Sequence, residues 1–148
     1  MDYQMGRIGR VIVAKFNNGD EILNSLVDMA RKEDVKAAVV YLIGGMQKGK
    51  IVVGPEKDEL PPDPIWREFD ESHEVFGVGT IFRQDGEPKI HFHGAFGKKD
   101  NVKVGCLREN AETFLVLEAI IIEIEGINAV RELDHATGLS LLKLLPTS

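Results

Sequence analysis

The segment 87–106 constrains the fold most, because its apolar residues alternate with other residues as the side chains of a β-strand do. Three apolar residues then share the face that suits a core: Ile90, Phe92 and Phe96. His91 and His93 lie with Ala95 on the opposite face, the two histidines about 6.6 Å apart along the strand. We therefore predict a half-buried strand over 89–97 that presents two histidines side by side.

The two histidines and the single cysteine of the chain can form a metal site. A bend at 98–101 would let the chain return alongside the histidine strand and bring Cys106 next to His91 and His93. Imidazole nitrogens bind zinc at about 2.0–2.1 Å, and thiolate is also a zinc ligand. This pattern predicts a His-His-Cys site for a borderline-soft divalent metal, with one coordination position open. The alternative is two half-exposed polar histidines and a cysteine that packs as a small hydrophobe.

The composition indicates a globular protein and argues against a membrane-spanning one. With 148 residues and an apolar fraction of 43%, the chain is long enough for one domain, 1–148, with a sizeable core. Its longest apolar stretch, 114–124, contains two glutamates and is far shorter than the roughly 20 residues of a membrane span. The first residues show no secretory signal, and one cysteine excludes an internal disulfide. We therefore expect a cytoplasmic protein.

The net charge of −6 disfavours autonomous binding to nucleic acid, because that binding depends on a basic face that neutralises phosphates. The basic clusters are short: Arg7 with Arg10, Lys48 with Lys50, and Lys98 with Lys99. A local basic patch remains the alternative.

The first half of the chain predicts a strand, a helix and a second strand. Residues 7–16 are rich in β-branched residues and favour a strand. Asn18 followed by Glu21 is typical of a capping box, and apolar residues at helical spacing follow up to Ala30. The apolar run 35–43 predicts a strand buried on both faces. Gly44 and Gly45 are expected to end it at a bend with positive φ, and a shorter strand resumes at 49–53.

The second half predicts only strands and loops. The proline-rich and charged segment 55–64 indicates a surface loop, and an edge-like strand follows it at 65–69. The remaining strands are predicted at 74–83, 89–97, 102–107, 113–124 and, after a turn at 137–138, near the end of the chain. One helix and about eight strands give an α+β fold, a mainly antiparallel or mixed sheet closing toward a barrel, with one principal packing helix.

Two carboxylates and two glycines have open interpretations. Glu118 lies in an apolar strand and is either a partner that orients a ligating histidine or a residue of an exposed sheet face. Glu74 and Glu118 are the candidate catalytic acids. Gly77 and Gly79, on the strand expected beside the histidines, indicate close packing, a bulge or room for a ligand. His135 is expected at the surface.

Several short motifs in this order resemble the PPC domain (plants and prokaryotes conserved), which accompanies AT-hook segments in plant nuclear proteins and stands alone in archaea and bacteria. The motifs are Gly19-Asp20-Glu21, Ala37-Ala38-Val39-Val40 running into Gly44, Asp85-Gly86-Glu87-Pro88, His91-Phe92-His93 and Asp134-His135-Ala136-Thr137-Gly138-Leu139. The resemblance covers nearly the whole chain. It implies a homotrimer held by sheet-edge and strand contacts, and a fold similar to acetolactate decarboxylases, which hold zinc through a His-x-His pair and a third histidine.

The resemblance also implies metal ligands at matching positions. The His-x-His pair corresponds to His91 and His93, while the third histidine, in a Gly-Gly-His-Leu motif, is replaced by Cys106 in Val104-Gly105-Cys106-Leu107. A thiolate can serve as the third zinc ligand, or the substitution marks a member without the metal. The chain lacks an AT-hook, and Arg7-Ile8-Gly9-Arg10 fits the first strand instead, so DNA binding is not carried over.

Two hypotheses about function follow. In the first, the protein is a small cytoplasmic homotrimer that binds zinc through His91, His93 and Cys106 and acts on a small oxo-acid-like molecule. In the second, it is a non-enzymatic interaction module that binds a protein partner, or DNA through a local patch, and its histidines are structural. Neither a catalytic reaction nor a biological process follows from the sequence.

Overall fold

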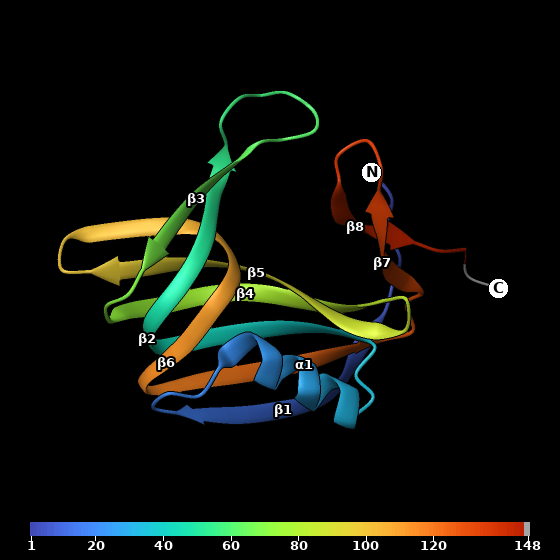
Figure 1. Cartoon of the computed structure of the whole chain (residues 1–148). Coiled ribbons are helices and arrows are strands. Elements are labelled where there is room, and N and C mark those ends of the chain that lie inside the picture. The colour runs from blue at the N-terminus through green and yellow to red at the C-terminus, as the bar shows by residue number, and fades with distance from the viewer. Residues whose placement is uncertain (147–148) are drawn as a thin grey trace.

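The structure is a computed structural model that describes residues 1–146, and over that range it contains one helix and eight strands in one sheet (Figure 1). This confirms the predicted α+β class. The elements are β1 (Arg7–Asn17), α1 (Ile22–Lys32), β2 (Ala37–Pro55), β3 (Pro64–Phe69), β4 (His73–Gln84), β5 (Glu87–Lys98), β6 (Asn101–Glu125), β7 (Ala129–Asp134) and β8 (Leu139–Leu144). Within the described residues, no helix is long and apolar enough to cross a membrane.

The sheet curls into a partial ring because each of its two long strands, β2 and β6, pairs with different neighbours along its two halves. The first half of β2 pairs with β4, β4 pairs with β5, and β5 pairs with the first part of β6. That part of β6 returns to the second half of β2, through pairs such as Ile51 with Leu107 and Val52 with Cys106. The remainder of β6 pairs with β1 on one side and with the first half of β2 on the other.

The expected breaks in β2 and β6 do not occur. The sequence predicted that Gly44 and Gly45 end a strand, and that 102–107 and 113–124 are separate strands, but β2 and β6 each run through. Register shifts between the two strands and positive φ values at Gly44 (139°), Asn110 (57°) and Leu115 (58°) let them bend without ending. The prediction of positive φ at Gly44 is confirmed.

The helix packs against the inner face of the sheet, and its start differs from the prediction. Its buried residues are Ile22, Leu26 and Ala30, as the periodicity indicated. Glu21, rather than Asn18, caps the helix, because its carboxylate accepts a hydrogen bond from the backbone N–H of Asn24 at 2.5 Å. The Asn18 side chain instead accepts from the N–H of Leu115 at 2.8 Å, where β6 bulges. The Asn18 side chain, which the sequence predicted to cap the helix, therefore binds the backbone of the bulge in β6 instead.

The inner face of the ring is filled by alternate residues of the strands. Phe92 and Phe96 are fully buried, as predicted, and on β4 Gly79 lies opposite Phe92 while Gly77 lies opposite Gly94. A Cβ atom at either glycine would approach the Phe92 ring or the backbone of β5 to 3.0 Å or less. Of the three interpretations of these glycines, close packing is the one that the structure supports.

The outer face of the ring is unusually apolar. The expectation that the strand at 35–43 is buried on both faces is therefore wrong. Alternate residues of β2 point inward, but Tyr41 and Ile43 are exposed on the outer face, so the strand is not buried on both sides. Exposed apolar residues of neighbouring strands lie next to them in register: Val13, Phe76, Val78 and Ile120. We call these six residues the outer apolar face.

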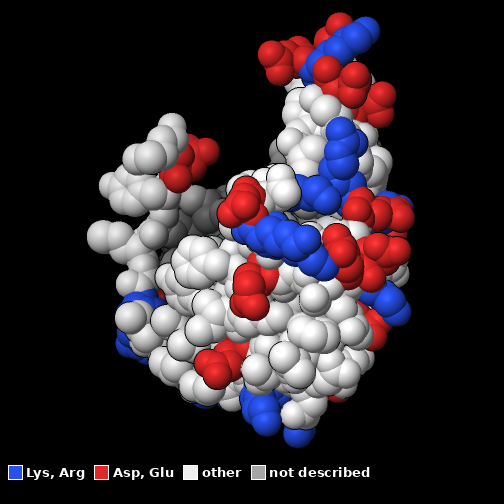
Figure 2. Space-filling view, turned by 90° about the vertical axis from the view of Figure 1, so that its left-hand side faces the viewer, with Lys and Arg blue, Asp and Glu red and all other residues white. Residues whose placement is uncertain are grey.

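Two segments project from the ring on its upper side in Figure 1: the loop 56–63 with the edge strand β3, and the hairpin of β7 and β8. The loop carries most of its charges near its tip, and Figure 2 shows acidic and basic side chains gathered there, while much of the body below is uncharged. The hairpin joins the ring through one parallel pair, Arg83 with Val130. The two projections stand over the mouth of the ring.

One ion pair ties β1 to the inward face of β6. The carboxylate of Glu123, which is nearly buried, accepts hydrogen bonds from Nε and Nη2 of Arg10 at 2.6 and 2.8 Å. These hydrogen bonds and the charge of Arg10 hold the pKa of Glu123 below its usual value. The pair therefore contributes stability that is complete above the unfolded-state pKa of about 4.3 and is lost as the pH falls through the lower folded-state value.

Replacing Glu123 with glutamine is expected to lower the urea midpoint of unfolding at pH 7, because Arg10 loses its charged acceptor. The difference from wild type should shrink as the pH is lowered below about 4, where the wild-type carboxylate is itself protonated. Glu125→Gln is the matched control, because Glu125 pairs with Arg7 at the surface and such pairs contribute little. A difference that stays constant from pH 7 to pH 3 would contradict this role of the charge.

Candidate metal centre

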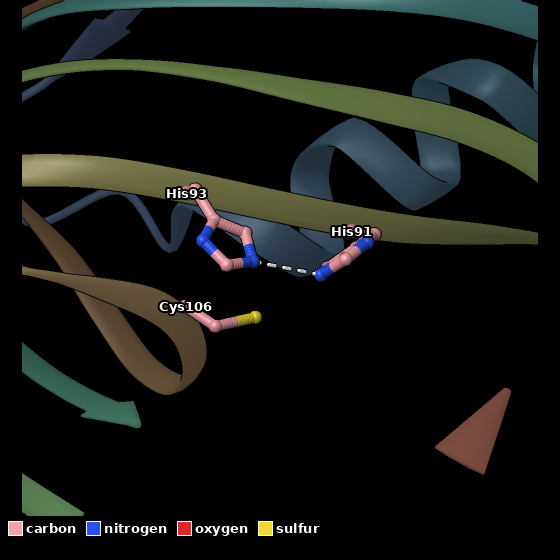
Figure 3. A group of neighbouring side chains, drawn as sticks. All are labelled: His91, His93 and Cys106. Atoms are coloured by element: carbon pink, nitrogen blue, oxygen red, sulfur yellow. Dashed lines mark hydrogen bonds between the residues drawn. The ribbon is translucent and has the colours of Figure 1, made fainter. Parts of the chain in front are cut away.

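The hairpin of β5 and β6 brings the three predicted ligands together (Figure 3). The chain turns at Lys99 and Asp100, within the predicted bend, and Lys99 has a positive φ of 53°. The resulting register places Cys106 directly opposite His93. Directly opposite residues of an antiparallel pair point to the same face. The alternation of β5 puts His91 on that face too, two residues before His93.

The spacing of the donor atoms fits one small metal ion. The Nε2 atoms of His91 and His93 are 2.9 Å apart and share a hydrogen bond, and one donor atom from each of the three residues lies within 4.8 Å of the others (Figure 3). Two ligand atoms on a tetrahedral zinc ion are about 3.3–3.6 Å apart, given bonds of about 2.0–2.3 Å. Rotations of the imidazole rings and of the thiol that move the donor atoms by less than roughly 1.5 Å would produce that arrangement.

The environment favours a neutral His91 and a protonated thiol at Cys106. Burial of part of the ring, followed by the positive charges of Arg131, His93 and Arg108, lowers the pKa of His91 to about 4. The imidazole therefore has a free lone pair at neutral pH. Burial raises the pKa of the Cys106 thiol, against the opposing effects of Arg108 and the Phe92 backbone. A metal ion binding to Cys106 would therefore have to displace a proton.

A cleft of about 460 Å³ opens above these three side chains. Its other walls are mostly apolar and come from β2, β3, the loop between them and β8: Val52, Gly54, Pro55, Pro62, Pro64, Trp66 and Leu139, together with Arg108 of β6. The only tryptophan of the chain thus faces the candidate metal centre. A cleft of this size admits a small organic molecule beside a metal ion.

The two candidate catalytic acids are not at the site. Glu118 is exposed on the outer sheet face, opposite Lys15 and Ile43, which is the simpler of its two interpretations. Glu74 is exposed near the far end of β4, opposite Gly45 and Gly97. Neither lines the cleft, and its described lining contains no carboxylate. His135 is exposed at the turn between β7 and β8, as predicted.

Sequence reasoning missed two arginines beside the site. Arg108 lines the cleft, and its position two residues after Cys106 would have predicted a shared face. Arg131 approaches from β7, and no local pattern links it to the histidines.

A larger cleft, of about 630 Å³, lies between α1, β3 and the bulged part of β6. Its charged residues pair with neighbouring side chains: Lys48 contacts Glu112 at 2.9 Å, and Lys50 contacts Glu68 at 3.6 Å. Because both lysines of its lining are paired with carboxylates, size alone does not make it the better candidate.

Comparison with known proteins identifies the family. A model of the Plants and Prokaryotes Conserved (PCC) domain matches residues 3–125. The chain belongs to this family. The predicted resemblance to the PPC domain, as the family is also called, is thereby confirmed. No curated protein matches the chain significantly.

Solved structures show the same fold. A PPC protein from Pyrococcus horikoshii is 26% identical, with a TM-score of 0.84, and the match covers 99% of this chain and 100% of that one. A metal-containing protein from Archaeoglobus fulgidus is 22% identical, with a TM-score of 0.82 and the same coverage. A candidate DNA-binding protein from Bacteroides thetaiotaomicron is 18% identical, with a TM-score of 0.78, and the match covers 95% and 99% of the two chains. None of these matches shows the implied likeness to acetolactate decarboxylases.

Proposed function

We propose that this PPC protein binds one zinc ion through His91, His93 and Cys106 and presents it to a small molecule in the cleft. The observation that carries the proposal is the convergence of two imidazole nitrogens and a thiol, within 4.8 Å of one another, below a cleft of about 460 Å³. The fold shared with the metal-containing protein from A. fulgidus supports it. Three protein ligands with a fourth position open are typical of zinc sites that act on a bound molecule.

The chain's own residues would supply the metal ligands and an apolar wall that limits the access of water. A bound zinc ion can polarise a carbonyl group or lower the pKa of a water molecule. Trp66 and the prolines at 62 and 64 limit the access of water from one side, and none of the described residues that line the cleft has a carboxylate that could serve as a general acid. The site is therefore suited to binding and orienting a small oxo-acid-like molecule. We leave the reaction itself unassigned.

We propose that the protein forms a homotrimer, because the outer apolar face is exposed to water in a single chain. Phe76 is 64% exposed and Val13 is 75% exposed, and register places them in one continuous face with four other apolar residues. Contiguous exposed apolar residues of this kind mark interaction surfaces. The histidines lie on the same face of the sheet as these apolar residues, because Val78 lies directly opposite His93. Self-association would therefore cover a surface that adjoins the metal centre.

The second candidate is a non-enzymatic interaction module. The outer apolar face is the observation that favours it, with a different protein in place of a second copy. DNA as the partner draws support from the description of the B. thetaiotaomicron protein. The net charge of −6 weighs against DNA. We rank this module below the metal-binding function.

Metal analysis of the untagged protein tests the proposed function. We expect about one zinc per chain by inductively coupled plasma mass spectrometry, and almost none in a His91→Ala/His93→Ala variant, because a single thiolate holds zinc weakly. His135→Ala is the matched control and should retain the metal, since His135 lies at an exposed turn outside the site. Wild-type protein that stays metal-free after incubation with zinc would contradict the proposal and leave the interaction module.

A further inference from the structure

Two arginines beside the candidate metal centre have no acidic partner. Arg108 lines the cleft with the three candidate ligands, and it forms no hydrogen bond or ion pair through its side chain with any residue in 1–146. Seven of the other basic side chains of the sheet strands, by contrast, contact a carboxylate: Arg7, Arg10, Lys48, Lys50, Arg83, Lys98 and Lys143. The positive charge of Arg108 is thus directed at the cleft and left uncompensated.

Arg131 is buried and only partly satisfied. It is 7% exposed, and its Nη2 donates to Oγ1 of Thr80 at 2.9 Å, while its Nη1 donates to the carbonyl oxygen of Ser140 at 3.2 Å. Both acceptors are neutral, and Nε is buried with no partner among the described residues. The guanidinium also lies 5.9 Å from the centre of the Phe82 ring. A buried cation without a counter-charge is costly, so the arrangement calls for an anion.

The register of the sheet puts Arg131 next to the metal ligands. Thr80, its hydrogen-bond acceptor, lies directly opposite His91 in the pairing of β4 with β5. The two side chains share a face, so the guanidinium sits beside the imidazole on the side of β7. The candidate centre therefore has one arginine, Arg108, in the cleft lining and a second, Arg131, outside that lining beside His91, and no described carboxylate lines the cleft.

We infer that Arg131 and Arg108 form a carboxylate-binding subsite, which holds the acid group of a small organic acid while another of its oxygens reaches the metal position. This inference deepens the proposed function and rests on it for the second contact. Guanidinium groups match the planar carboxylate with paired hydrogen bonds. The apolar walls at Trp66, Pro62 and Leu139 suit a short carbon chain. A cleft of about 460 Å³ limits the ligand to a small molecule.

Titration with pyruvate tests the subsite, and Trp66 provides the signal, because the only tryptophan lines the cleft. Zinc-loaded full-length protein should bind pyruvate at least about tenfold more tightly than the neutral pyruvamide, which has the same size but no charge. Arg108→Met and Arg131→Met should each weaken pyruvate binding by about tenfold or more and leave pyruvamide binding unchanged. Arg67→Met is the matched control and should change neither affinity, since Arg67 is exposed on β3 next to Trp66 and does not line the cleft.

The zinc content of each protein separates this inference from the proposed function. If the protein holds zinc but does not bind pyruvate, or binds pyruvate and pyruvamide equally, the subsite is overturned and the metal site stands. If the protein holds no zinc, an arginine-dependent preference for pyruvate would support the subsite alone, and no preference would overturn both. Inorganic phosphate that binds more tightly than pyruvate would overturn the assignment to carboxylates. Should Arg131→Met fail to fold, Arg108→Met still decides the outcome, because Arg108 is exposed and makes no contact on which folding depends.

Discussion

Replacing Gly77 with alanine is expected to destabilise the protein severely. A Cβ atom at this position would overlap Cζ of Phe92, and it would lie 2.5 Å from the carbonyl oxygen of His93 and 2.8 Å from Cα of Gly94. The last two are backbone atoms of the paired strand, so no change of side-chain rotamer can relieve the contact. β4 and β5 would have to move apart, and the pairing that holds the histidines in place would be lost.

Overpacking of a core usually costs about 1–3 kcal/mol, and the backbone contacts here place the expected loss at about 3 kcal/mol or more. That is a large part of the roughly 5–15 kcal/mol that stabilises a typical domain. Urea unfolding followed by circular dichroism measures the loss directly. Gly97→Ala is the matched control at the end of the same sheet, because the nearest atom to its added Cβ would be 3.8 Å away. Equal stabilities of the two variants would contradict the close packing of β4 on β5.

A single charge in the outer apolar face is expected to turn the proposed trimer into a monomer. Phe76 lies opposite Ile43 on β2 and Ala95 on β5, at the β4 side of that face. Phe76→Glu would bury one unpaired carboxylate per subunit in the interface, which costs several kcal/mol each time. Light scattering coupled to gel filtration should give three times the 16.4 kDa chain mass for wild type and the mass of one chain for the variant.

Leu60→Glu is the control for that experiment. Leu60 is 73% exposed in the loop 56–63, away from the outer apolar face, so the variant should remain a trimer. Because Phe76 is already exposed in the single chain, Phe76→Glu should fold and keep its zinc. A wild-type protein that is monomeric at all concentrations would overturn the homotrimer and assign the face to another partner.

Local patterns predicted the elements and much of the candidate site. Alternation in 89–97 placed Phe92 and Phe96 in the core and the two histidines on the other face, and the short polar bend before Asn101 predicted the return of Cys106. Two-residue periodicity and turn chemistry are local properties, so one sequence suffices to read them. The helix stripe from Ile22 to Ala30 was readable for the same reason.

Other features depended on pairing between distant segments. The cap at Glu21 was mispredicted because Asn18 contacts Leu115, a residue 97 positions away in a bulge that no local rule locates. The expected end of a strand at Gly44 failed because register shifts let the long strands bend through the glycines. Glu74 and Glu118 lie on the same outer face as the histidines, and only the strand pairing, which places them opposite Gly97 and Ile43, keeps them out of the cleft.

The sequence by itself determined the α+β class, the half-buried histidine strand and the hairpin that brings Cys106 to His91 and His93, because each depends on residues close together in the chain. Only the tertiary structure decided that the sheet curls into a partial ring, that its outer face stays apolar and exposed, and that Arg131 reaches the site from β7. These features arise from contacts between segments separated by tens of residues. The electrostatic character of the site, two arginines without an acidic partner beside His91, therefore emerges only when the chain is folded.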